Sequence, residues 1–245
     1  MSKKVALVTG GTGGIGEAVC KRFVQDGYKV VAAYNNKEKA ETWQKVQKEA
    51  GLDIEIVHCP VTNFEACGVA IKWVEDHVGP IDILVNNAGI TKDGGFKKMT
   101  PERWDDVIDT NLNSVFNMTR QIFEGMMERG FGRIINISSV NGQMGQFGQC
   151  NYTAAKAGMH GFTKSLARET ARKGVTVNTV SPGYVATPMV MAIAEEVRQK
   201  IEEGIPMGRL CMAEEIAHGV SYLASDLAAY TTGSELSING GLFMH

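Results

Sequence analysis

The sequence of 245 residues lacks every pattern that marks a disulfide framework or a zinc site. Its cysteines are odd in number, scattered and never spaced Cys-x-x-Cys. They are Cys20, Cys59, Cys67, Cys150 and Cys211. Its five histidines are dispersed as well. We therefore expect reduced thiols in a cytoplasmic protein that holds no metal ion.

Long apolar runs and a strong charge of either sign are also missing. No apolar stretch reaches the roughly 20 residues that a membrane-spanning helix needs. Glycines and Glu17 interrupt the first apolar stretch too early for a signal peptide. The formal net charge is only −2, which gives no bulk attraction to nucleic acid or anionic membranes. Neither is expected as a partner.

What the sequence does contain is a regular alternation of apolar runs and helical patterns. The runs predict strands over residues 4–8, 29–33, 53–58, 81–85, 133–137, 176–180 and 235–238. Most are continuously apolar, as parallel strands covered on both faces should be. The helical pattern over residues 100–129 opens with Thr100 as its N-cap and Pro101 in its first turn. Length and order predict an α/β fold with one domain over residues 1–245, built on a doubly wound parallel sheet.

A glycine-rich turn follows the first predicted strand. Gly10, Gly14 and Gly16 stand within residues 9–16, and a helical pattern begins directly after them. Strand, glycine turn and helix form the context of a dinucleotide-binding turn. Missing Cβ atoms let the backbone approach a pyrophosphate, and the start of the helix offers free N–H groups. The spacing Gly-x-x-x-Gly-x-Gly differs from the usual Gly-x-Gly-x-x-Gly.

A second group of polar residues lies in the other half of the chain. Tyr152 and Lys156 begin a helical pattern that continues to about residue 173, so their side chains project from one face of one helix. Ser139 follows the predicted strand over residues 133–137. A hydroxyl, a phenol and an ammonium thus gather at the carboxyl ends of strands, where open α/β sheets bind ligands. We interpret them as a proton-transfer site.

Together these features resemble the short-chain dehydrogenase/reductase superfamily, whose glycine motif has the same longer spacing. The resemblance covers essentially the whole chain and includes residues 86–89, Asn111 and residues 182–183. It implies a cofactor half over roughly residues 1–138 and a catalytic and substrate half over roughly residues 139–245. The implied cofactor-binding residues are Gly10, Gly13, Gly14, Ile15, Gly16, Tyr34, Asn35, Lys39, Val61, Asn87, Ala88, Gly89, Tyr152, Lys156, Pro182, Gly183 and Val185. Relatives commonly have an adenine-binding aspartate where this chain has Pro60, so that contact is lost.

The resemblance also implies a catalytic set of Asn111, Ser139, Tyr152 and Lys156. Tyr152 is the expected general acid, and the Lys156 ammonium should lower the pKa of its phenol from the ordinary value of about 10. By the same resemblance, Lys156 binds the nicotinamide ribose, Ser139 donates to the substrate carbonyl, and Asn111 anchors a water that relays protons. The thirteen-residue spacing to the tyrosine favours Ser139 over Ser138.

The end of the second predicted strand bears on the choice between NADH and NADPH. NAD-dependent relatives usually carry an acidic residue there, which binds the ribose hydroxyls and repels a 2′-phosphate. Here Tyr34 takes the acidic position, neutral Asn35 follows, and two lysines including Lys39 lie within reach. We expect NADPH, because these lysines can pair with the phosphate. Glu38 stands in the same loop, so an ordinary solvated loop is the alternative.

The segment between Ser139 and Tyr152 should select the substrate. Its Gly-Gln-Phe-Gly-Gln run over residues 145–149 resembles acetoacetyl-CoA reductases, which use NADPH to make (R)-3-hydroxybutyryl-CoA for polyhydroxybutyrate. The implied substrate-binding residues are Asp93, Lys98, Ser139, Gln146, Phe147, Gln149 and Tyr184. The irregular stretch over residues 182–209 could close over the substrate. A loop that merely faces solvent is the alternative for both segments.

Two other functions stay open. Reductases of 3-oxoacyl chains on acyl carrier protein share the fold and the catalytic residues, and they dock the acidic carrier on basic residues near the site entrance. Arg129 and Arg172 stand where such residues are found. A catalytically silent dinucleotide-binding protein is the third reading, and the intact catalytic set argues against it. The superfamily is usually tetrameric, which makes a homotetramer the expected assembly.

Overall fold

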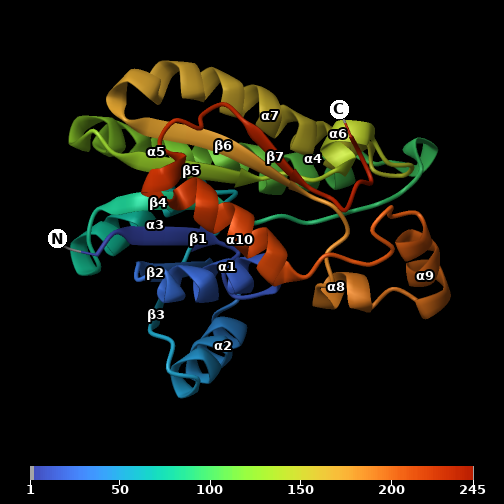
Figure 1. Ribbon diagram of the computed structural model, residues 1–245, viewed down its shortest axis with the longest axis horizontal. Helices are drawn as coiled ribbons and strands as arrows, with labels where there is room; N and C mark the ends of the chain where they lie inside the picture. The colour runs from blue at the N-terminus through green and yellow to red at the C-terminus, as the bar shows by residue number, and fades with distance from the viewer. Residues whose placement is uncertain (1–2, 245) are drawn as a thin grey trace.

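The computed structural model describes residues 3–244 and places the seven predicted strands in one sheet. Every neighbouring pair of strands is parallel. The order across the sheet is β3-β2-β1-β4-β5-β6-β7. The chain therefore starts near the middle, winds outward to β3, and then winds the other way from β4 to β7 (Figure 1). The doubly wound parallel fold expected from the sequence is confirmed.

The strands differ from their predicted bounds by no more than two residues at either end. They are β1 (Val5–Thr9), β2 (Lys29–Tyr34), β3 (Ile54–His58), β4 (Ile81–Asn86), β5 (Gly132–Ile137), β6 (Val175–Pro182) and β7 (Glu235–Ile238). Three strands run one residue further at their carboxyl ends, through Thr9, Tyr34 and Asn86. The apolar run of each strand stops before these polar residues, which are the last residues of β1, β2 and β4.

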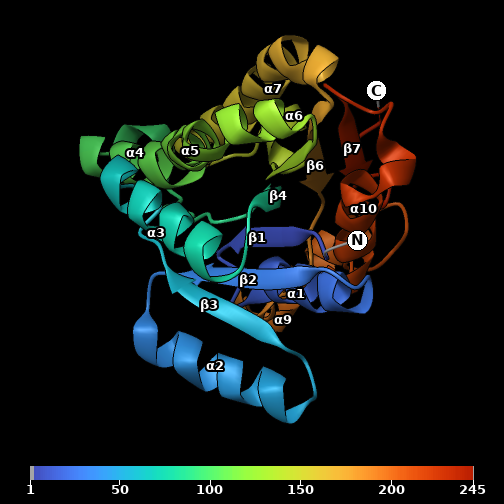
Figure 2. The same cartoon turned by 90° about the vertical axis from the view of Figure 1, so that its left-hand side faces the viewer.

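Helices cover both faces of the sheet (Figure 2). One face packs against α3 (Phe64–His77), α5 (Ser114–Arg129) and α7 (Cys150–Thr170). The other packs against α1 (Gly14–Gln25), α2 (Lys37–Glu49) and α10 (Ala213–Ala224). Alternate residues of β1 enter the two cores, and both cores exclude water, so β1 is apolar from Val5 to Val8. The shorter elements are η1 (Phe96–Lys98), α4 (Pro101–Ile108), η2 (Asp109–Asn113), α6 (Asn141–Met144), η3 (Ala171–Lys173), α8 (Pro188–Met191), α9 (Glu195–Glu203) and η4 (Asp226–Ala228).

The helix predicted over residues 100–129 is interrupted. It begins as expected, because the Thr100 hydroxyl accepts the N–H of Arg103 at 3.4 Å and Pro101 opens α4. Between α4 and α5, however, η2 forms a π-helical turn that contains Asn111. One widened turn leaves the surrounding apolar pattern intact, so sequence periodicity does not reveal it. Such turns are frequent at functional sites.

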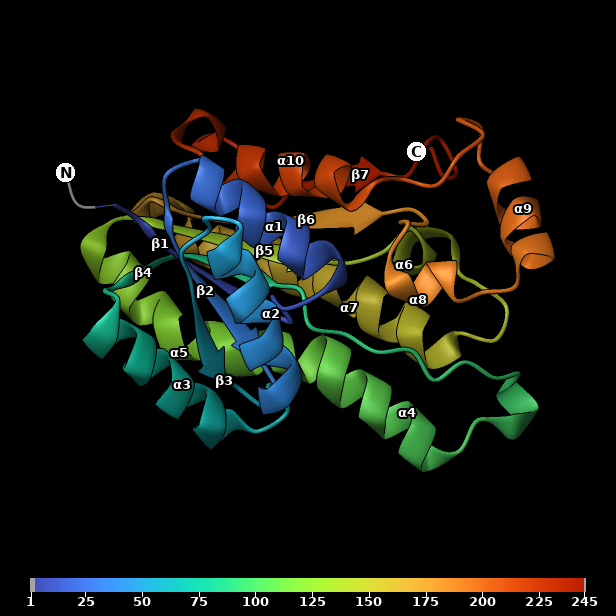
Figure 3. The same cartoon turned by 90° about the horizontal axis from the view of Figure 1, so that it is seen from below.

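The stretch after β6 leaves the sheet and forms α8 and α9. These helices lie at the end of the molecule toward which the strands run, away from the amino terminus (Figure 3). The long loops before α4 and around α6 lie at the same end. Within residues 3–244, none of the helices combines the length and apolar character needed to cross a membrane.

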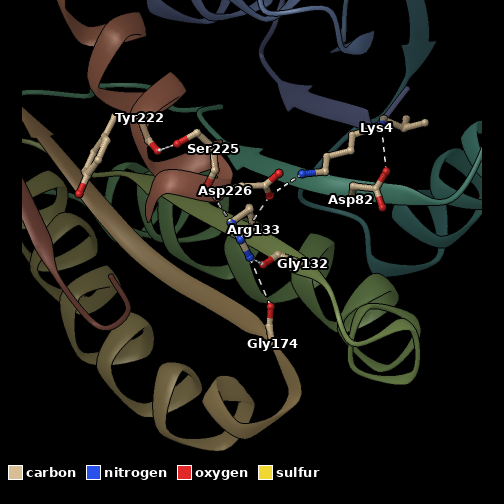
Figure 4. Close-up of polar contacts among 9 residues, drawn as sticks. Lys4, Asp82, Gly132, Arg133, Gly174, Tyr222, Ser225 and Asp226 are labelled. Atoms are coloured by element: carbon tan, nitrogen blue, oxygen red, sulfur yellow. Dashed lines mark hydrogen bonds and ion pairs between the residues drawn. The ribbon is translucent and has the colours of Figure 1, made fainter. Parts of the chain in front are cut away.

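The opposite edge, where the strands begin, is held by a buried arginine (Figure 4). Arg133 on β5 donates to the carbonyl oxygens of Gly132 at 2.9 Å and Gly174 at 3.3 Å. Asp226, which pairs with Lys4 at 2.6 Å, lies 3.9 Å from the guanidinium. Burial lowers the pKa of Arg133, and Asp226 partly opposes that effect. Arg133 thus joins the start of β5 to the residue before β6 and to Asp226 after α10, and Asp226 in turn pairs with Lys4, the residue before β1.

Replacing this cation should weaken the fold without touching the other edge. We expect Arg133→Met to lower the free energy of unfolding by about 2–4 kcal/mol, because it removes the guanidinium that donates to the buried Gly132 carbonyl and to the Gly174 carbonyl. Urea denaturation measures the change. The matched control is Arg120→Met, which removes an exposed i,i+4 ion pair with Glu124 and should cost under about 0.5 kcal/mol. Equal midpoints for the two variants would contradict the structural role of Arg133.

Candidate active site

The glycine turn lies between β1 and α1. Gly10 and Gly14 have φ angles of 61° and 54°, in the backbone region that favours glycine. A Cβ atom at Gly16 would lie 2.2 Å from the carbonyl oxygen of Gly10, so the turn excludes a side chain there. Gly13 faces open space and precedes α1 without any side-chain cap. The N–H groups of the first helical turn, which includes Ile15, are therefore available to a ligand.

The loops after β4 and β6 close around this turn. The side-chain amide of Asn87 donates to the carbonyl oxygens of Thr9 at 2.9 Å and Gly10 at 3.2 Å. On the other side, the Thr187 methyl carbon lies 3.5 Å from the position of a Cβ atom at Gly14. An exposed glycine, uncapped helix N–H groups and a surrounding wall of backbone fit the pyrophosphate of a dinucleotide.

Thr9 is a site residue that the sequence reasoning missed. Its hydroxyl oxygen accepts the backbone N–H groups of Asn87 at 2.9 Å and Ala88 at 3.0 Å. These two bonds fix the predicted cofactor residues after β4 against the glycine turn. The available signal was a threonine at the last position before the first glycine, which apolar patterning treats as the end of the strand.

The predicted residues after β6 follow the same edge. Pro182 ends β6, and Gly183 donates its N–H to the carbonyl of Ile238 at 2.8 Å. Val185 is buried and pairs with Cys211 in a short parallel bridge. This segment continues to Thr187, which lies beside Gly14 of the glycine turn, and the cofactor roles of Pro182, Gly183 and Val185 stay predictions.

The residues expected at the adenosine end lie at the ends of β2 and β3. Tyr34 ends β2 and is partly buried, whereas Asn35 is exposed. Lys39 is exposed in the first turn of α2, which Asn36 caps by accepting the Lys39 N–H at 3.0 Å. Val61 follows β3 and is buried. The end of β2 therefore carries the uncharged residues Tyr34 and Asn35, and the Lys39 ammonium follows in the first turn of α2.

The four expected catalytic residues converge where β4 and β5 end. The Tyr152 phenol is hydrogen-bonded with Ser139, and Nζ of Lys156 lies 5.6 Å from the centroid of the Tyr152 ring. A Cβ atom at Gly89 would lie 3.2 Å from Oδ1 of Asn111 and 3.6 Å from Nζ of Lys156. Gly89 therefore marks the place where the lysine and the asparagine approach each other.

Lys156 is almost completely buried, with 3% of its surface exposed. Its ammonium donates to the carbonyl oxygen of Ile137 at 2.7 Å. Burial lowers the pKa of this lysine from its ordinary value of 10.5 to about 7. Near neutral pH the side chain is thus poised between its charged and neutral forms, which suits a group that passes protons.

Tyr152 corrects one expectation from the sequence. Burial raises the pKa of its phenol, the hydrogen bond with Ser139 partly lowers it, and Asp93 raises it further. Lys156 does not lower it as expected, because the ammonium points at the Ile137 carbonyl and is itself weakened by burial. The phenol accordingly stays protonated at neutral pH, which is the form that a general acid requires.

Asn111 is held by the backbone on both sides of its amide. The N–H of Ile90 donates to its Oδ1 at 2.8 Å, and its Nδ2 donates to the carbonyl of Ile90 at 2.9 Å. The residue is completely buried inside the π-helical turn. This side chain therefore fixes the loop after β4, and its predicted role as a water anchor stays a prediction.

The substrate segment contains a connected set of polar side chains. The Gln149 amide donates to Asp93 Oδ2 at 2.9 Å and accepts from Asn141 Nδ2 at 2.9 Å. The backbone N–H of Asn141 donates to the Ser139 hydroxyl oxygen at 3.1 Å. Burial raises the pKa of the Tyr184 phenol, which a hydrogen bond with Asn141 partly lowers. Sequence reasoning missed Asn141, although it stands only two positions after Ser139.

Other predicted substrate residues lie at the rim rather than against the catalytic group. Gln146 and Lys98 are exposed, and Phe147 exposes 92% of its surface. The loops that carry them are joined by a hydrogen bond from the Gly94 N–H to the Gly148 carbonyl at 2.8 Å. These three side chains are thus exposed to solvent, and their role in substrate binding stays a prediction.

Arg129 and Arg172 do not lie near that entrance. Arg129 donates to the carbonyl of Ile81 at 2.6 Å, where β4 begins, and Arg172 lies in η3 just before β6. Both belong to the edge where strands start. The expectation that Arg129 and Arg172 lie beside the site entrance of their own chain is therefore wrong. The physical reason is that α5 and α7 run antiparallel to the strands that follow them.

The buried lysine makes a prediction about stability. Lys156→Met should raise the thermal midpoint below pH 7, because it removes a desolvated ammonium. Between about pH 7 and 10.5 the folded lysine is neutral while the unfolded one binds a proton, so wild-type stability rises with pH in that window and the difference shrinks. Calorimetry over this pH range measures the thermal midpoints of wild type and Lys156→Met. Lys164→Met, at an exposed position of the same helix, is the control, and parallel curves for wild type and Lys156→Met would refute the prediction.

Comparison with known proteins agrees with this geometry. The family described as short chain dehydrogenase matches residues 4–198. The chain is similar to an acetoacetyl-CoA reductase of Allochromatium vinosum, with 56% identity over 99% of both chains, and to one of Cupriavidus necator, with 53% identity over both full lengths. A 3-oxoacyl-[acyl-carrier-protein] reductase of Vibrio cholerae is 45% identical over 98% of both chains. The chain belongs to the short-chain dehydrogenase/reductase family of nicotinamide-dependent oxidoreductases.

Proposed function

We propose that this protein reduces acetoacetyl-CoA to (R)-3-hydroxybutyryl-CoA with NADPH. The observation that carries the reaction type is the meeting of Ser139, Tyr152 and Lys156 beside a turn that fits a dinucleotide. The substrate is supported by full-length relatives named acetoacetyl-CoA reductases, at 53–56% identity. We further propose that the product feeds polyhydroxybutyrate synthesis in the cytoplasm.

The cofactor would be held along the carboxyl edge of the sheet. We assign its pyrophosphate to the turn over residues 10–16, its adenosine to the ends of β2 and β3, and its nicotinamide to residues 87–89 and 182–185. When bound, the nicotinamide supplies the hydride that reduces the substrate carbonyl carbon. Tyr34 and Asn35 place no carboxylate near the ribose, and the exposed Lys39 can pair with a 2′-phosphate. These features support NADPH over NADH.

The chain's own residues handle the proton. The raised pKa of Tyr152 keeps its phenol protonated, so it can donate to the carbonyl oxygen as that oxygen gains charge. The Ser139 oxygen accepts the Asn141 N–H, so the Ser139 proton can turn from the Tyr152 oxygen to the same carbonyl oxygen when substrate binds. Lys156, with a pKa of about 7, can then restore the proton on Tyr152. We assign Asn111 to the outer end of this proton path.

The polar strap formed by Asp93, Gln149 and Asn141 would position the acyl group. Both ends of the Gln149 amide are already bonded within the protein, so it shapes the wall of the site in addition to any contact with substrate. Gln146, Phe147 and Lys98 at the rim are free to meet the carrier arm, and an exposed aromatic ring can cover its apolar part. With Tyr184, these residues form the proposed substrate site.

Acyl carrier protein is the weaker choice of carrier. The basic residues that could dock it, Arg129 and Arg172, lie at the far edge of the same chain. A catalytically silent protein is disfavoured because the catalytic groups are both present and assembled.

We also propose a homotetramer, supported by the exposed stacked pair of Phe64 and Phe116, whose ring centroids are 5.9 Å apart. A mass by light scattering other than four times that of one chain would argue against it.

The general-acid assignment predicts the effect of removing one hydroxyl. Tyr152→Phe should lower kcat for acetoacetyl-CoA by about 10²–10⁴-fold while the dissociation constant of NADPH stays within about twofold. The loss of nicotinamide absorbance measures turnover, and fluorescence titration measures binding. Tyr222→Phe, at an exposed position of α10, is the matched control. A Tyr152→Phe variant that keeps half of the wild-type rate would rule out this role.

The cofactor assignment predicts a change in selectivity. The wild-type enzyme should have a higher kcat/KM with NADPH than with NADH. Tyr34→Asp should reduce that ratio by adding repulsion to the phosphate, and Lys39→Glu should reduce it by removing a cation, each by about tenfold or more. Lys45→Glu in the same helix changes the charge equally at a more distant position and should have little effect. Equal efficiency of the two cofactors with the wild-type enzyme would contradict the proposal.

A further inference from the structure

A chain of polar side chains begins one helical turn beyond Lys156. The His160 ring lies with Nε2 2.8 Å from the Ser138 hydroxyl oxygen and with Nδ1 3.0 Å from the Glu235 carboxylate. Ser181 donates to the other Glu235 oxygen at 2.5 Å. Ser138 also lies within 2.9 Å of the backbone carbonyl oxygen of Lys156. The two serines are buried, and the side chains of His160 and Glu235 expose only 13% and 18% of their surface.

This chain of contacts joins the helix that carries the catalytic lysine to three strands. His160 lies in α7, Ser138 directly follows β5, Ser181 lies in β6 and Glu235 opens β7. Ser138 is also the neighbour of Ser139 in the sequence. A shift of the His160 ring would therefore move Ser138. Ser138 in turn is bonded to the Lys156 carbonyl and is covalently joined to Ser139.

Counting protons shows that the arrangement has two states. Ser138 has one proton, and both the Lys156 carbonyl and Nε2 of His160 lie within reach. A charged imidazole donates from both nitrogens, to Glu235 and to Ser138, so the Ser138 proton goes to the Lys156 carbonyl. A neutral imidazole that donates to Glu235 must accept from Ser138, and the Lys156 carbonyl then loses this donor. The protonation of His160 thus selects the partner of Ser138.

A serine, a histidine and a carboxylate in this order resemble a hydrolytic triad. That activity does not fit here, because Ser138 is 3% exposed and no substrate can reach its hydroxyl. The position of the network beside the lysine fits a different role.

We propose that His160, held by Glu235, is a positioning residue that sets the placement of Lys156 and Ser139 through Ser138. This inference rests on the proposed reductase function, since those two residues are assigned to that reaction. The charged groups that face the ring are Glu235 from β7 and, from α7 itself, Lys156 and Lys164. Burial lowers the pKa of His160 below its ordinary 6.5, and Glu235 opposes that effect. Its change of state accordingly belongs to the acid side of the pH profile.

The first test compares kcat and KM in two variants. His160→Leu removes both ring nitrogens, and Glu235→Gln keeps the shape of the partner but removes its charge. Each should lower kcat for acetoacetyl-CoA by about tenfold or more with KM within about twofold, because misplacement of catalytic groups acts on the transition state. Glu235→Asp, which restores the charge, should recover part of the loss. His218→Gln, at an exposed histidine of α10, is the matched control.

The second test follows the pH dependence. Wild-type kcat should show an inflection on the acid side, and Glu235→Gln should move it to lower pH, because an imidazolium without its counter-charge is harder to form. His160→Leu should lack it. An NMR titration of the His160 ring in wild type and Glu235→Gln should give the same downward shift without any substrate. This readout holds even if the protein has another substrate, and Tyr152→Phe in the same assay shows whether the activity measured is the proposed one.

The inference is overturned if both variants keep kcat within twofold of wild type and only their thermal midpoints fall, since that result indicates a structural role alone. It is also overturned if the pH profile of Glu235→Gln coincides with that of the wild type. Should His160→Leu fail to fold, Glu235→Gln with its nearly unchanged volume decides the question.

Discussion

The burial of one ammonium group is the constraint on which the site depends. Lys156 keeps 3% of its surface exposed and has the Ile137 carbonyl as its bonded acceptor. An ammonium in that position loses its hydration, so its pKa falls to about 7 and it becomes a group that exchanges protons at physiological pH. The same burial raises the pKa of Tyr152. Burial thus moves the pKa values of the base and the acid in opposite directions, away from each other and toward their proposed tasks.

The parallel sheet supplies the geometry for this effect. Every strand runs in the same direction, so the loops that follow β1, β4, β5 and β6 meet at one edge although they are far apart in the sequence. Glycines then decide how closely they meet. At Gly16 a methyl group would collide with the Gly10 carbonyl, and at Gly142 it would collide with the stem of Lys156, 2.9 Å from its Cβ atom.

Most of the fold could be predicted from the sequence because its signals are local. Continuous apolar runs identify the strands, and the position of Thr100 before a proline identifies the start of α4. The π-helical turn around Asn111 could not be predicted, since one extra residue in a turn changes no apolar pattern. Nor could the bonds of Gln149, because a side-chain amide has four possible hydrogen bonds and the sequence does not say which are satisfied internally. The position of Arg129 could not be predicted from a motif match either. It depends on the direction of α5, whose last residue lies where β4 begins.

Stability and substrate binding are proposed to depend on residues at opposite ends of the strands. Arg133 and its acceptors hold the edge where strands begin, and the residues proposed to touch the carrier arm lie on loops at the other edge. Substitutions in those loops can therefore accumulate without loosening the cluster that secures the strand starts. Such a separation allows evolutionary exploration of new substrates at little risk to folding. Full-length relatives named for CoA and for acyl-carrier-protein substrates, at 53–56% and 45% identity, are what a scaffold of this kind is expected to produce.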